Sequence, residues 1–460
     1  MTQGLSIAAS SIAAETTAID TIAQNVANAQ TPGYVAETPV LTTVPGPGGT
    51  GSGDGVEVST ISQATNAILS TNTWQAQGAL SSVSALQQTL RSAETLFPIS
   101  AQSQTTSVTS GSNISEELSA FWNSWDSIAQ SPSASAPRIQ TIDSAQSLVV
   151  SLRQAASQLT EITSNVNAEL SDQISQVNTL LGKVASLNQA ITQSVNPGNA
   201  NELEDQLRQV VGTLAQLSGV SARLQADGTA TVSIGGVTVV QDATAVSLTL
   251  AKQGTPPSNA IVLATSPTVE VPATTGSVAG LLSAVNRYLP AYRAELDAVA
   301  TTLKNDVNAQ LAKGYTATGT SGATHPLFVG TGASGLSVAG PVVADPTLLA
   351  ASGTPTPSAA VNNGANAQAM AELATSPTGP DATYRTLVQN IGTDTQSANN
   401  QLAAATAVAT QAKTALQAVS GVDITEQMTQ LLTDQQNFEA SAKLVSIVSA
   451  TVQSLEQAIA

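Results

Sequence analysis

The side chains best suited to catalysis are few in this 460-residue chain. His325 is the single histidine, and there is no cysteine. One histidine can serve as a general base, but it cannot build a multi-histidine metal site, and the lack of thiols excludes disulfides and cysteine nucleophiles. His325 precedes Pro326 in a loop-like stretch without a nucleophile motif beside it. We therefore expect no catalytic residue, no metal site and no cofactor.

Two glycine-rich stretches have a spacing that also occurs in nucleotide sites. Residues 46–51 and 330–335 both match Gly-x-Gly-x-x-Gly. A dinucleotide site needs a strand before this motif and a helix after it, and neither stretch shows that context, so we interpret both as loops. Acidic neighbours such as Glu116 and Glu117 are explained as charges that complement a helix N-terminus. A hydrolytic pair of carboxylates stays open as the alternative.

Charge excludes further classes of function. Only 10% of the residues are charged, against about 25% in typical proteins. The 14 basic and 31 acidic residues give a net charge of −17, which repels nucleic-acid phosphates. No stretch approaches the roughly 18 apolar residues of a membrane-spanning helix, and the first residues lack the features of a cleaved signal peptide. We expect no nucleic-acid partner and no contact with a membrane.

The elements that would position any site begin with two helices at the chain ends. Apolar residues recur every seven positions at both ends, a spacing typical of coiled coils. Each such helix must bury its apolar stripe, and the simplest solution is that the two pack against each other. We expect a terminal core domain of residues 1–40 with 420–460. The predicted seam consists of Leu5, Ile12, Ile19, Val26, Leu431, Phe438, Val445, Val452 and Ile459.

Between the ends, the pattern changes from helix to strand and back. Residues 139–195 have the spacing of one long helix, residues 219–275 alternate as strands do, and residues 278–313 are helical again. The predicted fold is mixed, mainly α with inserted β: an antiparallel rod of helices formed by both chain ends, with the β-rich domain at the far end. The expected domains beside the terminal one are a helical bundle of residues 41–200 with 365–419 and an outer domain of residues 201–364.

Two tryptophans lie three positions apart on one predicted helix. Trp122 and Trp125 would share a helix face, and we interpret them as core anchors. A sugar-binding or peptide-binding role is the less favoured alternative.

A cluster near the N-terminus carries a resemblance. Locally, residues 24–34 are explained as a helix end followed by a turn. The sequence Asn-x-x-Asn-x-x-Thr-x-Gly-Tyr also resembles the N-terminal signature of the bacterial flagellar rod, hook and hook-associated proteins, and residues 420–443 are similar to the C-terminal signature of that family. The motifs around residues 121–132, 200–206 and 227–236 are most similar to the members that join hook and filament. The predicted assembly motif is Asn25, Asn28, Thr31, Gly33 and Tyr34.

The resemblance implies a structural subunit of the flagellum. Its members assemble as a ring between hook and filament, so the implied partners are further copies of the chain, the flagellar hook protein and the second hook-filament junction protein. It also implies export to the cell exterior without a cleaved signal, with a dedicated export chaperone at the C-terminal helix.

The chain departs from the family pattern at two places. Val35, Ala36 and Glu37 follow the signature where members commonly have a basic residue, so no contact of that cation is expected. Gln206-Leu207-Arg208 replaces Gln-Arg-Asp, and the ion pair of that motif is not carried over.

Two other classes of function stay open on the sequence alone. One is a secreted adhesin or host-interaction protein that acts through its β-rich region. The other is an enzyme whose activity depends on His325 or a carboxylate in the inserted region.

Overall fold

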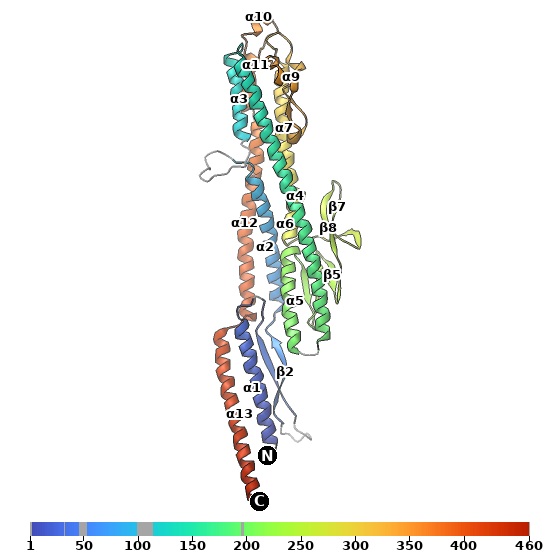
Figure 1. Ribbon diagram of the computed structural model, residues 1–460, viewed down its shortest axis with the longest axis vertical. Helices are drawn as coiled ribbons and strands as arrows, with labels where there is room; N and C mark the ends of the chain where they lie inside the picture. The colour runs from blue at the N-terminus through green and yellow to red at the C-terminus, as the bar shows by residue number, and fades with distance from the viewer. Residues whose placement is uncertain (1, 32, 46–52, 99–113, 195–196, 460) are drawn as a thin grey trace.

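The molecule is a long rod with both chain ends at one tip (Figure 1). The computed structural model describes residues 2–31, 33–45, 53–98, 114–194 and 197–459. The helices are α1 Thr2–Asn28, α2 Ala67–Glu94, α3 Ile114–Gln130, α4 Ser135–Gln193, α5 Pro197–Ser218, α6 Ser277–Ser283, α7 Leu289–Ala312, α8 Gly332–Gly335, α9 Gly340–Ala344, α10 Pro357–Ala360, α11 Ala365–Ala371, α12 Pro380–Ser420 and α13 Ile424–Ile459.

The tip that holds both termini is built from α1, α13 and a hairpin. Helices α1 and α13 lie side by side and run in opposite directions (Figure 1). Strands β1 Glu37–Thr43 and β2 Val56–Gln63 pair antiparallel and follow α1, where the Ser6 hydroxyl donates to the Asp54 carboxylate at 2.7 Å. We call this part the terminal unit. The glycine-rich residues 46–51, which the sequence analysis interprets as a loop, fall between these two strands in the sequence and lie outside the described residues.

The body of the rod is a bundle in which α2, α4, α7 and α12 share one core. Helix α4 has 59 residues and is therefore about 88 Å long at 1.5 Å per residue. Side-chain hydrogen bonds also join neighbouring helices: for example, Gln87 of α2 donates to Asn399 of α12 at 2.7 Å, and Tyr292 of α7 donates to Asp394 of α12 at 2.9 Å. A Cβ on Gly280 would come within 2.1 Å of the Ser82 carbonyl oxygen, so glycine allows α6 to cross α2 closely.

A proline shapes the helix expected over residues 278–313. Pro290 cannot donate a backbone hydrogen bond. The chain accommodates it with a turn of π-helix, Ala284–Tyr288, between α6 and α7. The expected helix is therefore present, but in three segments.

The remaining strands form small antiparallel sheets beside α4. Two asparagines of α4 hold them, because Asn188 exchanges both amide hydrogen bonds with the backbone of Ala230 at 2.9 Å, and Asn178 does so with Leu248 at 2.7 and 2.9 Å. The sheet orders are β3-β4-β5-β6, β7-β8-β9 and β10-β11. The strands are β3 Ser221–Leu224, β4 Ala230–Ile234, β5 Val237–Gln241, β6 Thr244–Ala245, β7 Leu248–Gln253, β8 Ser258–Leu263, β9 Ser266–Glu270, β10 Phe328–Val329 and β11 Ser337–Val338.

The mainly α fold with inserted β strands is confirmed, but its layout differs from the expectation. Strands β3 to β9 lie beside the lower half of α4, and the far end consists of α3, α9, α10 and α11 (Figure 1). The reason is that α4 starts at the far end and runs back toward the terminal unit before the strands follow. The expected outer domain of residues 201–364 does not have a core of its own, because α7 within it packs into the core shared with α4 and α12.

Trp122 and Trp125 lie in the aromatic part of this core near the far end. Trp125 is fully buried, with its ring 6.3 Å from that of Phe121, which in turn lies 5.7 Å from Phe328. Trp122 is 4% exposed, and its indole nitrogen donates to the Asp381 carboxylate at 2.7 Å. Both side chains thus pack α3 onto its neighbours.

Candidate assembly site at the joint of the terminal unit

Asn25 connects three segments at the base of the terminal unit. Its amide nitrogen donates to the Glu37 carbonyl oxygen at 2.8 Å and to Gln427 Oε1 at 2.9 Å. Its amide oxygen accepts from the Tyr34 hydroxyl at 2.8 Å and from the Glu37 backbone N–H at 2.9 Å. Asn25 is fully buried, and all four of its hydrogen-bonding positions are used. This side chain therefore joins α1, the start of β1 and α13.

The other residues of the predicted assembly motif form the turn after α1. The Thr31 hydroxyl donates to Asn28 Oδ1 at 3.1 Å, and the Asn28 amide donates back to the Gln24 carbonyl oxygen. Gly33 has a φ of +86°, a backbone conformation that favours glycine. Burial raises the pKa of the Tyr34 hydroxyl above its ordinary value, so Tyr34 stays a neutral donor toward Asn25. Asn25 and Tyr34 thus meet, whereas Thr31 and Gly33 are exposed.

The contact between α1 and α13 is formed largely by small and polar side chains. The hydroxyls of Ser11 and Ser441 lie 2.9 Å apart, and Asn25 reaches Gln427 two heptads further along the pair. A Cβ on Gly4 would lie 3.9 Å from Val448. Successive pairs are seven and then fourteen residues apart on each helix, and small side chains there let the two helices approach closely.

The predicted apolar seam lies beside this row. Ile12, Ile19 and Val26 are half-buried on α1, and so are Leu431, Phe438 and Val445 on α13. Leu5 and Val452 are exposed, at 42% and 36%, and the Ile459 side chain lies outside the described residues. Further large apolar side chains of α13 are exposed: Ile424, Met428, Leu432, Leu444 and Ile447. A role of the seam in assembly stays a prediction.

Two carboxylates face each other across this contact. Asp434 is 5% exposed and accepts from Gln430 at 2.8 Å. Burial, and then the charge of Asp434, raise the pKa of Glu15 above its ordinary value of 4.5, while a hydrogen bond from Asn437 opposes the shift. A like-charged neighbour therefore weakens the α1–α13 pair at neutral pH.

Replacing Glu15 by glutamine should modestly raise the melting temperature of the terminal unit near pH 7. Because the pKa of Glu15 is raised in the folded chain, the folded state binds more protons than the unfolded state above pH 4.5, and wild-type stability falls as the pH rises through the folded pKa. Below 4.5 the carboxyl is protonated in both states, so the advantage of Glu15→Gln should vanish. Thermal unfolding followed by circular dichroism at both pH values measures this.

The matched control is Glu439→Gln, which neutralises an exposed glutamate of α13. It should have little effect at either pH. A Glu15→Gln advantage that persists or grows in acid would contradict the carboxylate repulsion.

A second polar cluster joins the terminal unit to α5. The Arg208 guanidinium contacts Asp205, Glu204 and the side-chain oxygen of Gln63, and Gln63 donates to Asp205 at 3.0 Å. Burial raises the pKa of Asp205 more than Arg208 lowers it, because the Asp205 side chain is only 17% exposed. The sequence did not predict this cluster, since the expected ion-pair motif is absent there. The only sequence signal is the i, i+3 and i, i+4 spacing of Asp205 and Glu204 to Arg208.

The remaining candidates for chemistry show no constellation. His325 ends a short 3-10 turn, and Gly330–Gly335 includes α8, which packs on α7. The other glycine-rich match, residues 46–51, lies outside the described residues. Within the described part of the chain no group of three or more His, Asp or Glu side chains is placed to hold a metal ion. The helices among these residues also include none long and apolar enough to cross a membrane.

Comparisons with known families match two parts of the chain. Residues 100–328 match the family model of the flagellar hook-associated protein FlgK helical domain, and residues 415–458 match that of the flagellar basal body rod FlgEFG protein C-terminal region. The second match includes most of α13.

Individual relatives agree with these matches. Flagellar hook-associated protein 1 of Salmonella typhimurium is 27% identical over 327 residues, which cover 68% of this chain and 57% of the relative. The Escherichia coli protein of the same name is 25% identical, with 68% and 58% covered. The match thus spans less than two thirds of the length of these relatives.

One solved structure shares the fold along the rod. The flagellar hook junction protein FlgK from Burkholderia pseudomallei superposes with a TM-score of 0.62 at 18% identity, covering 77% of this chain and all of that chain. The helical-domain match and the rod-type C-terminal match on α13 agree with these relatives and with the shared fold, and the chain is similar to flagellar hook-associated protein 1.

Proposed function

We propose that this protein is a structural subunit of the bacterial flagellum that forms the junction between hook and filament and is required for filament assembly. The observation that carries the proposal is the terminal unit, in which both chain ends pair and still leave large apolar side chains exposed. Leu432 and Ile447 of α13 are each 59% exposed. Large apolar side chains left exposed along one helix favour association with other protein surfaces. The names of the relatives support a place in the flagellum.

The partners follow from that role. Copies of the chain would form a ring that contacts the flagellar hook protein on one side and the second hook-filament junction protein on the other. Export to the cell exterior would proceed without a cleaved signal, with an export chaperone on the C-terminal helix. The exposed apolar residues of α13 support such a chaperone contact, because an amphipathic helix can lay its apolar face into a groove. The family consists of structural flagellar proteins, which argues against catalysis.

Labelling at a single introduced cysteine tests the location. The chain has no cysteine, so Thr268→Cys on the exposed strand β9 creates a unique site for a fluorescent maleimide. In a strain that lacks its own copy of this gene, the variant should restore swimming and label one spot where each filament meets its hook. The unsubstituted chain is the control for background labelling. Label spread along the filament, or restored filaments without label at the hook tip, would contradict the proposed position.

A further inference from the structure

A cavity of about 490 Å³ lies at the joint between the terminal unit and the body. Its walls come from the turn after α1, from α2, α5 and the end of α12, and from the link to α13. Thr31 and Gly33 of the predicted assembly motif are at its edge. Nothing in the proposed function uses this cavity.

Nitrogen donors line the cavity without acceptors of their own. Trp74 is 7% exposed, and its indole N–H has no hydrogen-bond partner among the described residues. A Cβ on Gly212 would lie 3.4 Å from that nitrogen, so glycine at this position keeps the space beside the N–H open. Lys413 is exposed at the mouth of the cavity and has no ion pair within the described part of the chain. The Trp74 ring is largely buried while its N–H is open to the cavity, so it can donate to a ligand that supplies an acceptor.

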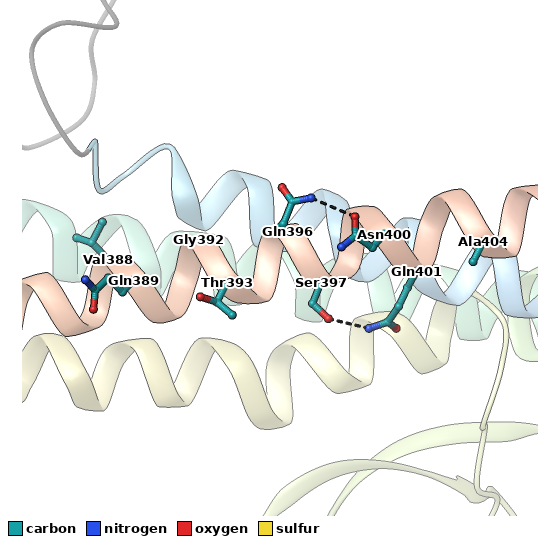
Figure 2. Close-up of a pocket in the computed structure, with 9 residues that line it drawn as sticks. All are labelled: Val388, Gln389, Gly392, Thr393, Gln396, Ser397, Asn400, Gln401 and Ala404. Atoms are coloured by element: carbon teal, nitrogen blue, oxygen red, sulfur yellow. Dashed lines mark hydrogen bonds between the residues drawn. The ribbon is translucent and has the colours of Figure 1, made fainter.

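Lys413 is an isolated positive charge on a neutral surface. It is the single charged residue between Asp394 and Asp423, and α2 has no charged residue from Ala67 to Leu90. Figure 2 shows residues 388–404 of α12, which precede Lys413 in the same helix. Polar side chains there bond to each other: Gln396 donates to Asn400 and Gln401 to Ser397, both at 3.1 Å. Arg208 also lines the cavity, but it is paired with Glu204 and Asp205, so Lys413 is the lining cation that has no ion pair among the described residues.

We propose that this cavity binds an acidic side chain of a second copy of the chain, with the carboxylate between Lys413 and the Trp74 N–H. The inference rests on the proposed function, because it describes how copies pack in the assembly. Charge complementarity favours this occupant: copies with a net charge of −17 repel each other, and an acidic group that meets an unpaired lysine on a neutral face offsets that repulsion. The cavity volume also exceeds that of a simple anion, and its edge is continuous with the terminal unit proposed to assemble.

Zero-length crosslinking with a carbodiimide tests this contact, because it joins a lysine amine to a carboxylate only when the two are in contact. In isolated hook-filament structures, Lys413 should be linked to an Asp or Glu of another copy, giving a two-chain band that peptide mass spectrometry identifies. The purified monomer should lack that band. Trp74→Phe keeps the ring and removes the N–H, and it should lower the yield of the link about tenfold.

Charge variants at Lys413 give a second readout, the amount of protein retained per hook. Lys413→Gln should lower retention about tenfold, whereas Lys413→Arg should retain wild-type amounts because the charge is kept. The matched control Lys183→Gln removes an exposed lysine of α4 and should have no effect. Lys413 is exposed, so Lys413→Gln should leave the thermal unfolding of the monomer unchanged.

The outcomes separate the two claims. If the protein is retained at the hook but Lys413 links to a different protein, links only within its own chain or forms no link, the inference is overturned and the proposed function stands. Normal retention of Lys413→Gln would overturn it as well. Absence of the wild-type protein from isolated flagella would overturn the proposed function and this inference together.

Discussion

Cells that produce the chain without residues 421–460 should have hooks but no filaments. The deletion removes α13, and with it the Gln427 side chain that accepts from buried Asn25 and the Ser441 hydroxyl that meets Ser11. It also exposes the half-buried side chains of α1 to water. Deleting residues 1–34 should have the same effect, because α13 then loses its only helical neighbour in the described terminal unit. Electron microscopy of hooks with and without filaments, together with swimming in soft agar, measures the loss.

Point substitutions on α13, in place of the deletion, distinguish an effect on assembly from an effect on folding. Leu432→Glu combined with Ile447→Glu places two charges on the exposed face of α13. The monomer should unfold as the wild type does, but burial of unpaired charges in an assembly is costly, so filament formation should fall to the level of the deletion. Thr268→Glu on exposed β9 is the matched control and should assemble normally. Filaments of normal number without residues 421–460 would show that α13 is dispensable, and filaments of normal number without residues 1–34 would show the same for α1. Normal filaments on the double variant would show that the exposed face of α13 is not needed for assembly.

The sequence predicted that the helices at the two chain ends pair. It did not predict which residues lie at the centre of the contact between α1 and α13. The heptad spacing identified Ile12, Ile19 and Val26, and these residues lie at the border of the contact. Gly4, Ser11 and Asn25 of α1 lie at the centre of the contact, and a search for periodic apolar residues does not detect such small or polar side chains. Close approach of two helices favours small side chains, so the central row follows from packing geometry rather than from hydrophobicity.

The joint was less predictable, because its residues come from distant parts of the chain. Gln63, Asp205 and Arg208 are brought together only once the β1–β2 hairpin lies against α5. That hairpin was missed because the glycine-rich residues between its strands were interpreted only as a loop, and local patterns do not say that the flanking residues pair across a twelve-residue gap. By contrast, Asn25 and Tyr34 are nine residues apart, and their signature drew attention to them even though their bond to each other was not foreseen.

The low share of charged residues has a different meaning once the fold is known. The neutral surfaces are not spread evenly but coincide with α2 and α12, which pair along the middle of the rod. Copies of a chain with a −17 charge can approach each other most easily through such a surface. For the same reason, Lys413 within that neutral surface should attract an acidic group more strongly than a lysine that has acidic neighbours.

Asn25→Leu should loosen the terminal unit by several kcal/mol. Leucine of similar size removes two donors and two acceptors, and it leaves the Tyr34 hydroxyl, the Glu37 N–H and carbonyl oxygen, and the Gln427 amide oxygen without their partner. Each buried group left unpaired costs about 1–3 kcal/mol. Hydrogen exchange of α1 and α13 amides is the suitable measurement, since the body of the rod can stay folded while the terminal unit opens.

Two further variants make the assignment specific. Asn28→Ala removes only hydrogen bonds within the turn after α1, so it should change exchange in α13 little. Asn25→Asp keeps the shape and both contacts to donors but turns the donor toward the Glu37 carbonyl oxygen and Gln427 Oε1 into a second acceptor. Burial would raise the pKa of this aspartate in the folded chain, so its destabilising effect should be full at neutral pH and should decrease as the pH falls through that pKa. If Asn25→Leu leaves the α13 amides as protected as in the wild type, Asn25 does not hold the two chain ends together, and their pairing must depend on the apolar border residues instead.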